Sequence, residues 1–478
     1  MKKKLFFLFA SLFIFAVLTA EELPAAELPD TTTLLLSYVE NDAELKNLTL
    51  AAKKAALAYQ SSKIDNGFDV TLSSGTVRLQ ISEDGSSLTA KPSLKASLPQ
   101  ASNLSLSAQT NISSESSDTK MSDTSLSAAV DIISSSMLSN KLTKLKAERS
   151  VTEAQRKIEK RAIAAEKEFY TELKGLLSSI STIMTKRQNL YEDSLDFEAK
   201  KIQGYSKSSS TYRQAELKVI SDQHEIDSAI HNFKYDCLVF YKKCGYDIEL
   251  DENADFMSFV PSGIEEVEPV DASQFDKALY SEIESSTWNY YINSMERSSK
   301  KTYSLSASAG YTFENSSTKS DSIDAGLSGS IGGITLGAGV SIPIGEGKTS
   351  NSPVYTFSAS LSPNTFRKNS ITKQQNEITE EQELLAIESA EAGYETKLVE
   401  LGQKLDSLLW EKKTLEENIS MYEALEKDMS ALYKQGYISE TEYLSSKNNL
   451  NNSIIKKVSN IIDLIIYNDD VISNFVSE

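Results

Sequence analysis

The stretch that decides the fold is Tyr433-Lys-Gln-Gly-Tyr-Ile-Ser-Glu-Thr-Glu-Tyr-Leu444. It separates two segments whose apolar residues have helical spacing, so it predicts a sharp reversal between two helices. Gly436 can adopt the left-handed backbone angles that a helix end needs, and Ser439 is placed as an N-cap ahead of Glu442. The sequence therefore predicts a helical hairpin that turns at Gly436.

A second turn of the same kind occurs earlier, at Lys201-Ile-Gln-Gly-Tyr-Ser206. Gly204 precedes Gly436 by 232 residues, since 436 − 204 = 232. The same offset aligns apolar positions well outside the turns: Phe169, Leu173, Leu176 and Leu177 fall on Leu401, Leu405, Leu408 and Leu409. We therefore expect an internal duplication built on two long helical hairpins.

Apolar periodicity divides the chain into two repeats, each predicted as a short helix, a block of strands, a long helix and a return helix. The expected boundaries are 1–20 for a signal peptide, 21–245 for the first repeat, 246–272 for an acidic connector and 273–478 for the second repeat. The expected helices cover about 30–63 and 137–203, a return helix ending near 241, then 273–300, 369–434 and a last helix that follows Gly436.

The N-terminus has the order of a secretory signal peptide. Lys2, Lys3 and Lys4 precede an apolar run at residues 5–18 and a small residue, Ala20. The run is too short to span a bilayer. We expect the mature, exported chain to begin near Glu21.

The long helices carry the seam of a coiled coil. In the first, apolar residues recur in steps of three, four and seven: Phe169, Leu173, Leu176, Ile180, Ile183, Leu190 and Phe197. The second has Leu401, Leu405, Leu408, Leu415, Ile419, Tyr422, Met429 and Tyr433 in the same frame. Both hairpins are thus expected to pack in one way.

About eight segments between residues 68 and 361 alternate apolar and polar residues, which predicts β-strands. One interpretation is a sheet with one face on a core and the other in water. The other is a membrane β-barrel, because the segments are about ten residues long. Their polar positions are mostly Ser, Thr and Gly, and aromatic residues lie near the strand ends: Tyr303, Tyr311, Phe313, Tyr355 and Phe357. With a signal peptide, the second interpretation is favoured, and several chains would share one barrel.

The formal net charge of −19 and the pI of about 4.8 exclude a nucleic-acid partner, which needs clustered Lys and Arg. The two cysteines, Cys237 and Cys244, are seven residues apart on a predicted helix, so their α-carbons lie about 10 Å apart. No disulfide can join them at that distance. We expect both to be packing residues.

At the second turn the chain resembles the TolC-type outer-membrane efflux ducts. The resemblance is carried by Tyr433-x-x-Gly436 followed by Ile438-Ser-x-x-x-Tyr-Leu444, and by Ser360-Leu-Ser-Pro363 ahead of the second long helix. It implies an α+β membrane protein in which long antiparallel helical hairpins form a periplasmic helical barrel. It also implies a homotrimer whose strands form a twelve-stranded β-barrel in outer-membrane lipid.

By the same resemblance the chain is a passive exit duct of a tripartite efflux or secretion system, located in the outer membrane with a large periplasmic portion. It would export small molecules or proteins. A periplasmic adaptor protein would dock on the turns, at Gly204, Tyr205, Gly436 and Tyr437, and would connect the duct to an inner-membrane pump.

Two features depart from that family. Its members have four strands per chain, where this sequence has about eight alternating segments. Their tips are narrowed by acidic rings and by a tyrosine and an arginine that bond an acidic neighbour. Tyr433 and Glu442 match two of these groups and are the gate candidates. Hydrophobic or hydroxyl residues stand at the remaining positions, namely Ile438 for the arginine, Ser445 for a second ring and Ser210 for the acidic partner.

We assign no catalytic, cofactor-binding or metal-binding residue. His224 and His231 could share a helix face, but two imidazoles without a third ligand are a weak metal signal. No phosphate-binding loop or nucleophile motif occurs, so the chain is not expected to be an enzyme. The alternative function is a surface-exposed structural or adhesive coiled-coil protein anchored by a β-barrel.

Overall fold

A computed structural model describes residues 29–82, 85–99, 103–115, 118–133, 135–248, 263–300, 303–313, 321–344 and 352–477. The expected signal peptide and most of the expected connector lie outside these residues. The chain forms two compact units. The first consists of Met1–Asn41, Phe169–Glu266 and Leu415–Ile462, and the second of Asp42–Glu168, Val267–Thr414 and Asp463–Glu478.

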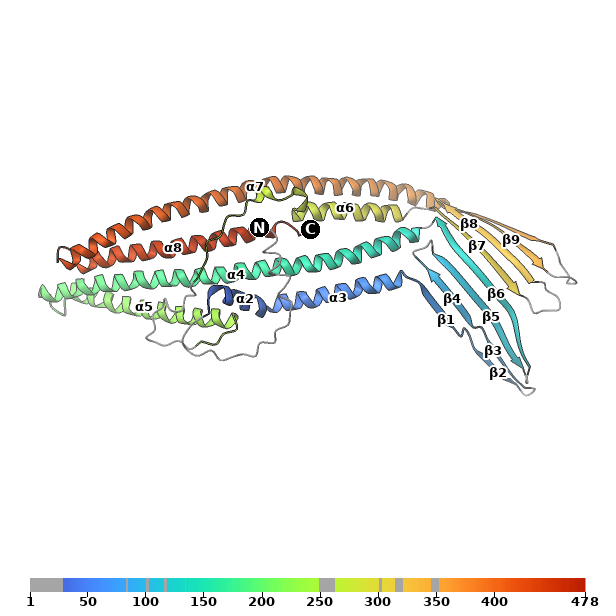
Figure 1. Cartoon of the computed structure of the whole chain (residues 1–478), viewed down its shortest axis with the longest axis horizontal. Coiled ribbons are helices and arrows are strands. Elements are labelled where there is room, and N and C mark those ends of the chain that lie inside the picture. Colours follow the sequence, from blue (N-terminus) through green and yellow to red (C-terminus); the bar gives the residue numbers. More distant parts are fainter. Residues whose placement is uncertain are drawn as a thin grey trace. The chain divides into compact units, whose positions relative to one another are not determined.

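Helices and strands follow in a similar order in the two halves of the chain (Figure 1). The first half has helices α2 (Thr31–Asn41), α3 (Ala43–Asp65), α4 (Ser135–Ile202) and α5 (Ser210–Lys243). The second half has the 3₁₀ turns η2 (Ala272–Gln274) and η3 (Lys277–Leu279), and helices α6 (Ser281–Ser299), α7 (Pro363–Lys434) and α8 (Glu440–Ser473). None of the helices in the described part of the chain has the length and apolar composition of a membrane span.

Three helix boundaries differ from the sequence prediction. The first expected helix is divided at Asp42, whose extended backbone and side chain cap the start of α3 by accepting a hydrogen bond from Leu45 N at 2.5 Å. The helix expected from 273 begins only at Ser281, after the two 3₁₀ turns. The helix expected from 369 begins at Pro363, because proline fits the first helical position, where no amide hydrogen is needed.

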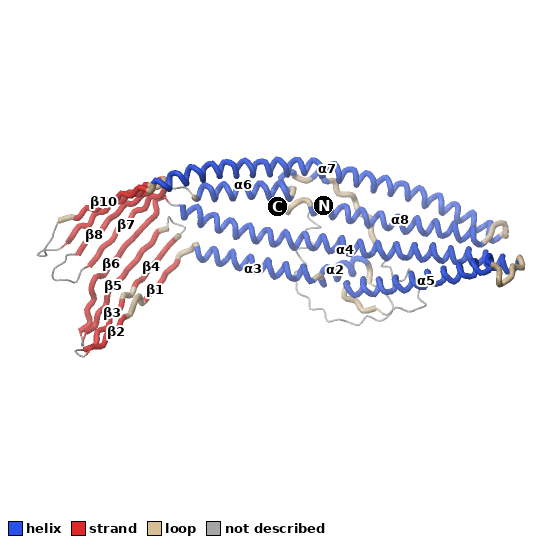
Figure 2. The backbone as a smooth tube through the Cα atoms, turned by 180° about the vertical axis from the view of Figure 1, so that it is seen from behind, coloured by secondary structure: helices blue, strands red, loops and turns tan. Residues whose placement is uncertain are grey.

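All ten strands of the described chain join one antiparallel sheet (Figure 2). They are β1 (Asp69–Ser73), β2 (Arg78–Ser82), β3 (Gly85–Ala90), β4 (Ser93–Leu98), β5 (Leu104–Glu115), β6 (Asp118–Ile133), β7 (Tyr303–Phe313), β8 (Asp321–Ile331), β9 (Ile334–Ile344) and β10 (Val354–Leu361). The order across the sheet is β1-β4-β5-β6-β7-β8-β9-β10, with β2 paired to β3 and β3 to β5.

The first hairpin of the sheet is interrupted by a bulge. Ser73 pairs with Ser93 and Arg78 with Thr89, so four residues of one strand face three of the other. Pro92 cannot donate to the ladder, but its carbonyl accepts a hydrogen bond from Thr110 N at 3.2 Å. β1 and β2 are therefore two parts of one long strand that the bulge interrupts, and β3 and β4 are two parts of the next. The sheet is eight strands wide, four from each half, in agreement with the eight alternating segments of the sequence.

The strand register keeps apolar side chains on one face of the sheet. Leu106, Ala128 and Ala309 lie in one row across β5, β6 and β7, and Leu327, Ala338 and Phe357 lie in another across β8, β9 and β10. This face is not a buried core in the single chain: Leu72 is 78% exposed and Phe357 80%. The interpretation of a sheet packed on its own core therefore does not describe this chain.

The opposite face of the sheet carries rows of hydroxyl groups that bond across the strands. Ser107 Oγ lies 2.6 Å from Ser127 Oγ, and Ser306 Oγ lies 2.8 Å from Ser328 Oγ. Glycine fills other positions of this face, for example Gly337 opposite Ser358. The face is thus polar without being charged along most of its width.

The first unit is held together by the predicted seam of α4. Phe169, Leu173, Ile180 and Ile183 are all buried, and the ring of Phe169 lies 5.2 Å from that of Phe240 on α5. Cys237 and Cys244 are free and buried, and burial raises the pKa of each thiol to about 12. The seam of α7 is less covered, since Leu405 and Leu408 are only half-buried.

The second unit has its own core where α6, α7 and α8 meet. Buried residues from these helices, from the segment before α6 and from the segment after α8 form it: Ala272, Tyr280, Ile283, Ala390, Tyr394, Leu401, Leu464, Tyr467, Val471 and Phe475. The rings of Phe275 and Phe475 stack at 4.5 Å. This aromatic cluster fixes the last residues of the chain against α6.

Two adjacent carboxyl groups on α8 have opposite surroundings in this unit. Asp469 is buried and its Oδ2 has no hydrogen-bond partner; burial, together with the nearby Glu166, raises its pKa to about 8. Burial also acts on Asp470, but its hydrogen bonds from Lys167 and Lys404 lower its pKa below the usual range. Asp469 is therefore held neutral, and Asp470 ionised, near pH 7.

The raised pKa of Asp469 predicts that the stability of the folded protein decreases as the pH rises. The unfolded chain ionises Asp469 near pH 4 and the folded chain only near pH 8, so the benefit of a neutral group is lost between these values. Because Asn cannot ionise, we expect Asp469→Asn to raise the free energy of unfolding at pH 8 by about 1–3 kcal/mol and to have little effect at pH 4.

The neighbouring variant is the control. Asp470→Asn should destabilise the protein at pH 8 by about 1–2 kcal/mol, because it removes the negative charge that Lys167 and Lys404 bind. Thermal unfolding of both variants at the two pH values tests this. Equal effects of the two substitutions at pH 8 would contradict the assignment.

The bulge in the first hairpin predicts a second stability effect. Gly75 has a φ of +61°, and an added Cβ would lie 1.9 Å from the carbonyl oxygen of Lys91. Gly436 has a similar φ but open space around it. Gly436→Ala should cost about 1–2 kcal/mol of backbone strain, and Gly75→Ala clearly more, because the two strands must also separate. Thermal unfolding that ranks the two variants in the reverse order would contradict this.

Candidate functional site

The two helical turns have the same backbone geometry. Gly204 and Gly436 both have a φ of +75°. Tyr205 N donates to Lys200 O at 3.3 Å, and Tyr437 N donates to Leu432 O at 2.9 Å. The glycines donate to the carbonyls three residues before them, Gly204 N to Lys201 O at 3.1 Å and Gly436 N to Tyr433 O at 2.9 Å. These paired bonds form the helix-ending motif that requires a left-handed residue. Glycine is needed for its backbone angle rather than for space, because nothing lies within 4 Å of an added Cβ.

Each turn exposes an aromatic side chain directly after its glycine. Tyr437 is 75% exposed and Tyr205 43%. Ile202, just ahead of the first turn, is also almost fully exposed. Exposed apolar and aromatic groups at the ends of two hairpins are typical of a contact surface for another molecule. The four predicted docking residues thus lie in the first unit with their side chains or backbone accessible.

The turns differ in length and charge. Residues 203–209 connect α4 to α5, whereas residues 435–439 connect α7 to α8. The first turn has cations beside it at Lys200 and Lys201 and within it at Lys207. Carboxylates begin the helix after the second, at Glu440 and Glu442. Similar backbones therefore present different chemistry to a partner.

The gate candidate Glu442 takes part in the predicted N-cap. Ser439 N and Ser439 Oγ both donate to Glu442 Oε2 at 2.8 Å, and Glu442 N donates to Ser439 Oγ at 3.3 Å. This is a reciprocal capping box, and it confirms the expected start of α8. The backbone and hydroxyl bonds from Ser439 lower the pKa of Glu442. In the single chain this carboxylate is directed at its own turn.

The other gate candidate, Tyr433, packs inside its own hairpin. Its ring stacks on that of Tyr443 with centroids 5.1 Å apart and planes at 4°. Tyr443 OH donates in turn to Glu426 at 3.3 Å. Tyr433 therefore helps to connect α7 with α8 close to the turn.

Sequence reasoning missed a row of polar contacts between α4 and α8. Tyr191 OH donates to Glu440 at 2.5 Å, and this bond raises the pKa of Tyr191 to about 12. Asn448 Nδ2 donates to Gln188 at 2.9 Å, and Ser181 Oγ donates to Asn452 at 2.6 Å. These contacts join the first hairpin to the second. No local sequence pattern pairs residues about 250 positions apart, so only the fold could reveal them.

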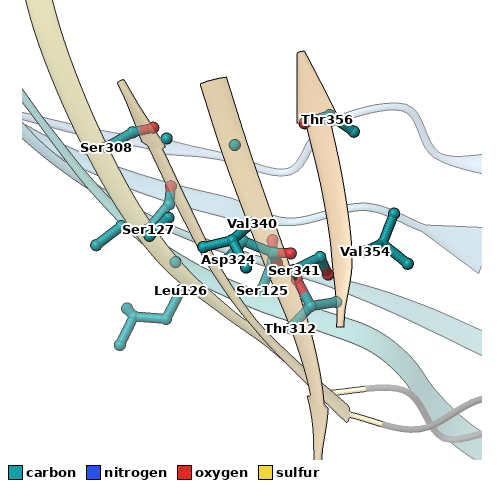
Figure 3. A pocket seen from close by; sticks show the side chains of 15 residues that line it. Ser125, Leu126, Ser127, Ser308, Thr312, Asp324, Val340, Ser341, Val354 and Thr356 are labelled. Carbon is teal, nitrogen blue, oxygen red and sulfur yellow. Dashed lines mark hydrogen bonds between the residues drawn. The ribbon is translucent and has the colours of Figure 1, made fainter. Parts of the chain in front are cut away.

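A shallow hollow of about 450 Å³ lies on the polar face of the sheet, across β6 to β10 (Figure 3). Six of its 15 lining residues carry hydroxyl groups, namely Ser125, Ser127, Ser308, Thr312, Ser341 and Thr356. Asp324 is the acidic member of the lining and accepts a hydrogen bond from Ser322 Oγ at 3.2 Å. This face offers water many hydrogen-bond partners. Among the residues that the structure describes, no three His, Cys, Asp or Glu side chains gather as a metal site.

Comparison with protein families matches residues 34–264 to the TP096X N-terminal domain and residues 265–478 to the TP096X C-terminal domain. The chain carries the TP096X domain pair. The boundary between the two matches lies within the connector expected at 246–272. No protein with curated annotation matches the sequence.

The TP096X pair is similar in fold to solved bacterial membrane proteins. A membrane protein from Pseudomonas aeruginosa is 14% identical, with 96% of this chain and 100% of that chain covered and a TM-score of 0.47. The open MtrE outer membrane channel of Neisseria gonorrhoeae is 12% identical, with 96% and 93% covered and a TM-score of 0.47. The outer membrane protein VceC of Vibrio cholerae is 11% identical, with 94% and 97% covered and a TM-score of 0.46.

The matched structures include outer membrane channels, the kind of protein that the second turn of the sequence resembles. At such identities the likeness concerns the fold alone. The function must therefore be argued from the side chains and faces of this chain.

The capping box at the second turn predicts a local effect on α8. Ser439→Ala removes the acceptor for Glu442 N and should destabilise the first turn of the helix by about 1 kcal/mol. Hydrogen exchange of the amides at 442 and 443 should then be about fivefold faster. Glu442→Gln keeps a capping side chain and should leave exchange within about twofold of the original protein.

The first turn supplies the matched comparison. Ser209 caps α5 by accepting from Tyr212 N at 3.3 Å, so Ser209→Ala should speed exchange there and not at 442. Unchanged exchange in both serine variants would show that the caps do not hold these helix starts.

Proposed function

We infer that this TP096X pair is a passive exit duct of the outer membrane, part of a tripartite efflux or secretion system. The observation that carries the proposal is the sheet, which has an exposed apolar face, a face of hydroxyl groups and glycine, and long helices attached at one end only. An apolar face of this width suits lipid, and the hydroxyl face suits a water-filled lumen.

The strand lengths support a membrane-crossing sheet. β7, β8 and β9 have 11 residues each, or about 36 Å at 3.3 Å per residue. Tilted by about 40°, such strands cover about 27 Å, close to the apolar band of an outer-membrane barrel. In lipid the backbone groups of the sheet edges must also be paired, so the sheet must close, and we place it in a homotrimer.

The long helices support a position in an aqueous compartment. α4 has 68 residues and α7 has 72, about 100 Å each, and both carry charged residues along their whole length. They would form the periplasmic helical barrel of the duct. No nucleotide-binding motif occurs in the sequence, so energy for export would come from an inner-membrane pump.

The turns at Gly204 and Gly436 are proposed as the docking site for a periplasmic adaptor. Tyr205 and Tyr437 supply exposed aromatic contacts, which are enriched in protein interfaces. Tyr433 and Glu442 are proposed as gate residues because the helices that bear them meet close to the turn. Acidic side chains near a throat attract cations, so the open duct should prefer cations over anions.

A tag experiment separates the duct from the alternative of an adhesive surface protein. One epitope is inserted between Lys207 and Ser208, in the first turn. The other is inserted in the segment that connects Phe313 at the end of β7 to Asp321 at the start of β8, at the ends of these strands that are not attached to helices. In a duct the first epitope should be labelled only after the outer membrane is permeabilised, and the second in intact cells. A surface stalk predicts labelling of the first epitope in intact cells.

The same cells test the location and the pore. The protein should fractionate with the outer membrane, and planar bilayers with a salt gradient should give a cation-selective reversal potential. A soluble periplasmic protein would refute the duct, and an anion-selective current would refute the acidic throat.

A further inference from the structure

The sheet has two open edges in the described chain. β1 pairs only with β4, and β10 pairs only with β9. The helix α3 leads into the first edge strand, and α7 continues from the other (Figure 1). Unpaired edge strands are templates for another strand, and water cannot satisfy them inside a membrane.

The two edge helices carry matching apolar stripes. On α3 the stripe is Leu50, Leu57 and Ile64, and on α7 it is Ile371, Ile378, Leu385 and Val399, all separated by seven residues or a multiple of seven. Each of these side chains is between 57% and 74% exposed in the single chain. A seven-residue apolar repeat is the pattern of a helix that packs along a partner helix.

α3 buries little apolar surface in this chain, because the residues of its other face, Leu45, Ala52 and Ala56 among them, are only half-buried. None of its 23 residues is buried. Most helical stability in proteins comes from packing of an apolar face, so a helix of this kind needs a partner. The structure thus leaves a complete helix face uncovered beside an uncovered strand edge.

The stripes lie at equal distances from the ends of α3 and α7 that face the sheet. Leu57 is eight residues before the end of α3 at Asp65, and Ile371 is eight residues after the start of α7 at Pro363 (65 − 57 = 371 − 363 = 8). Leu50 and Ile378 are both fifteen residues away (65 − 50 = 378 − 363 = 15). At 1.5 Å per residue these levels are about 12 and 22 Å along the helices.

We propose that the β10–α7 edge of one copy pairs with the β1–α3 edge of the next, strand on strand and helix on helix, so that each copy contributes eight strands to a shared barrel. Strand direction permits this closure. Eight is an even number, so β10 and the next β1 run antiparallel, and α7 and α3 then also run antiparallel with their apolar levels side by side.

The proposal rests on the duct function and changes its dimensions. A homotrimer would have 3 × 8 = 24 strands rather than the twelve implied by the family resemblance, and barrel diameter grows roughly in proportion to strand number. Eight strands spaced by about 4.8 Å and tilted by about 40° span about 50 Å of circumference. The four helices α3, α4, α6 and α7 span about 40 Å at about 10 Å each. The barrel would therefore be no narrower than the helical wall, and substrate size would be limited at the turns.

Cysteine cross-linking tests the strand contact. Thr71 and Ser358 both lie on the hydroxyl face, as does Ser360, whereas Ala359 lies on the apolar face. Thr71→Cys combined with Ser358→Cys or Ser360→Cys should form disulfides between copies on oxidation, giving a ladder that ends at the covalent trimer. Thr71→Cys with Ala359→Cys is the control and should not link, because a strand register preserves the faces. The native cysteines are buried and need no replacement.

The helix contact is tested in the same way. Leu57→Cys with Ile371→Cys should link neighbouring copies, and Leu57→Cys with Lys373→Cys should not, since Lys373 is about 200° around the helix from Ile371. Links between copies at both contacts support the proposal. Links at one contact only, links within a single copy, or no links at all overturn it. If the protein then still fractionates with the outer membrane and conducts ions, the duct function stands without it.

Discussion

The structure depends most on the need of an antiparallel sheet to pair its backbone and to cover an apolar face. In this chain the register holds the apolar residues of eight strands on one side, from Val70 on β1 to Phe357 on β10. The chain itself supplies no core for that side. Lipid covers such a face without a partner protein, and the open edges then require further strands. In the proposed duct, membrane insertion and assembly would therefore both follow from one alternating pattern.

The long helices α4 and α7 need packing partners of a different kind, because each extends over about 100 Å. The α4 seam buries Phe169 against Phe240 of α5, and the aromatic cluster around Tyr467 fixes α8 against α6 and α7. Polar contacts such as Tyr191 with Glu440 join the two hairpins near their turns. Polar contacts of this kind are weaker than a buried apolar seam.

The gate candidates show how a local structural role and a proposed functional role can share one residue. Glu442 satisfies the first amide groups of α8, and Tyr433 stacks against Tyr443 within its own hairpin. A throat built from these residues would be tied to the stability of the second turn. The first turn, with lysines in place of carboxylates, offers a partner a different surface on the same backbone.

The sequence by itself determined the two glycine turns, the long helices, the cap at Ser439 and the number of strands, because each depends on neighbours a few residues apart. Periodicity, capping and turn chemistry are local properties. The cap at Asp42 that divides the first helix is also a local feature. The sequence prediction missed it because the Ala- and Leu-rich pattern continues on both sides of Asp42. Only the tertiary structure decided that Gly75 lies against Lys91, that Tyr191 meets Glu440, and that Asp469 is buried beside Glu166. It alone placed the apolar stripe of α3 at an open edge of the sheet. These facts depend on pairings between residues far apart in the chain, which no single local pattern records.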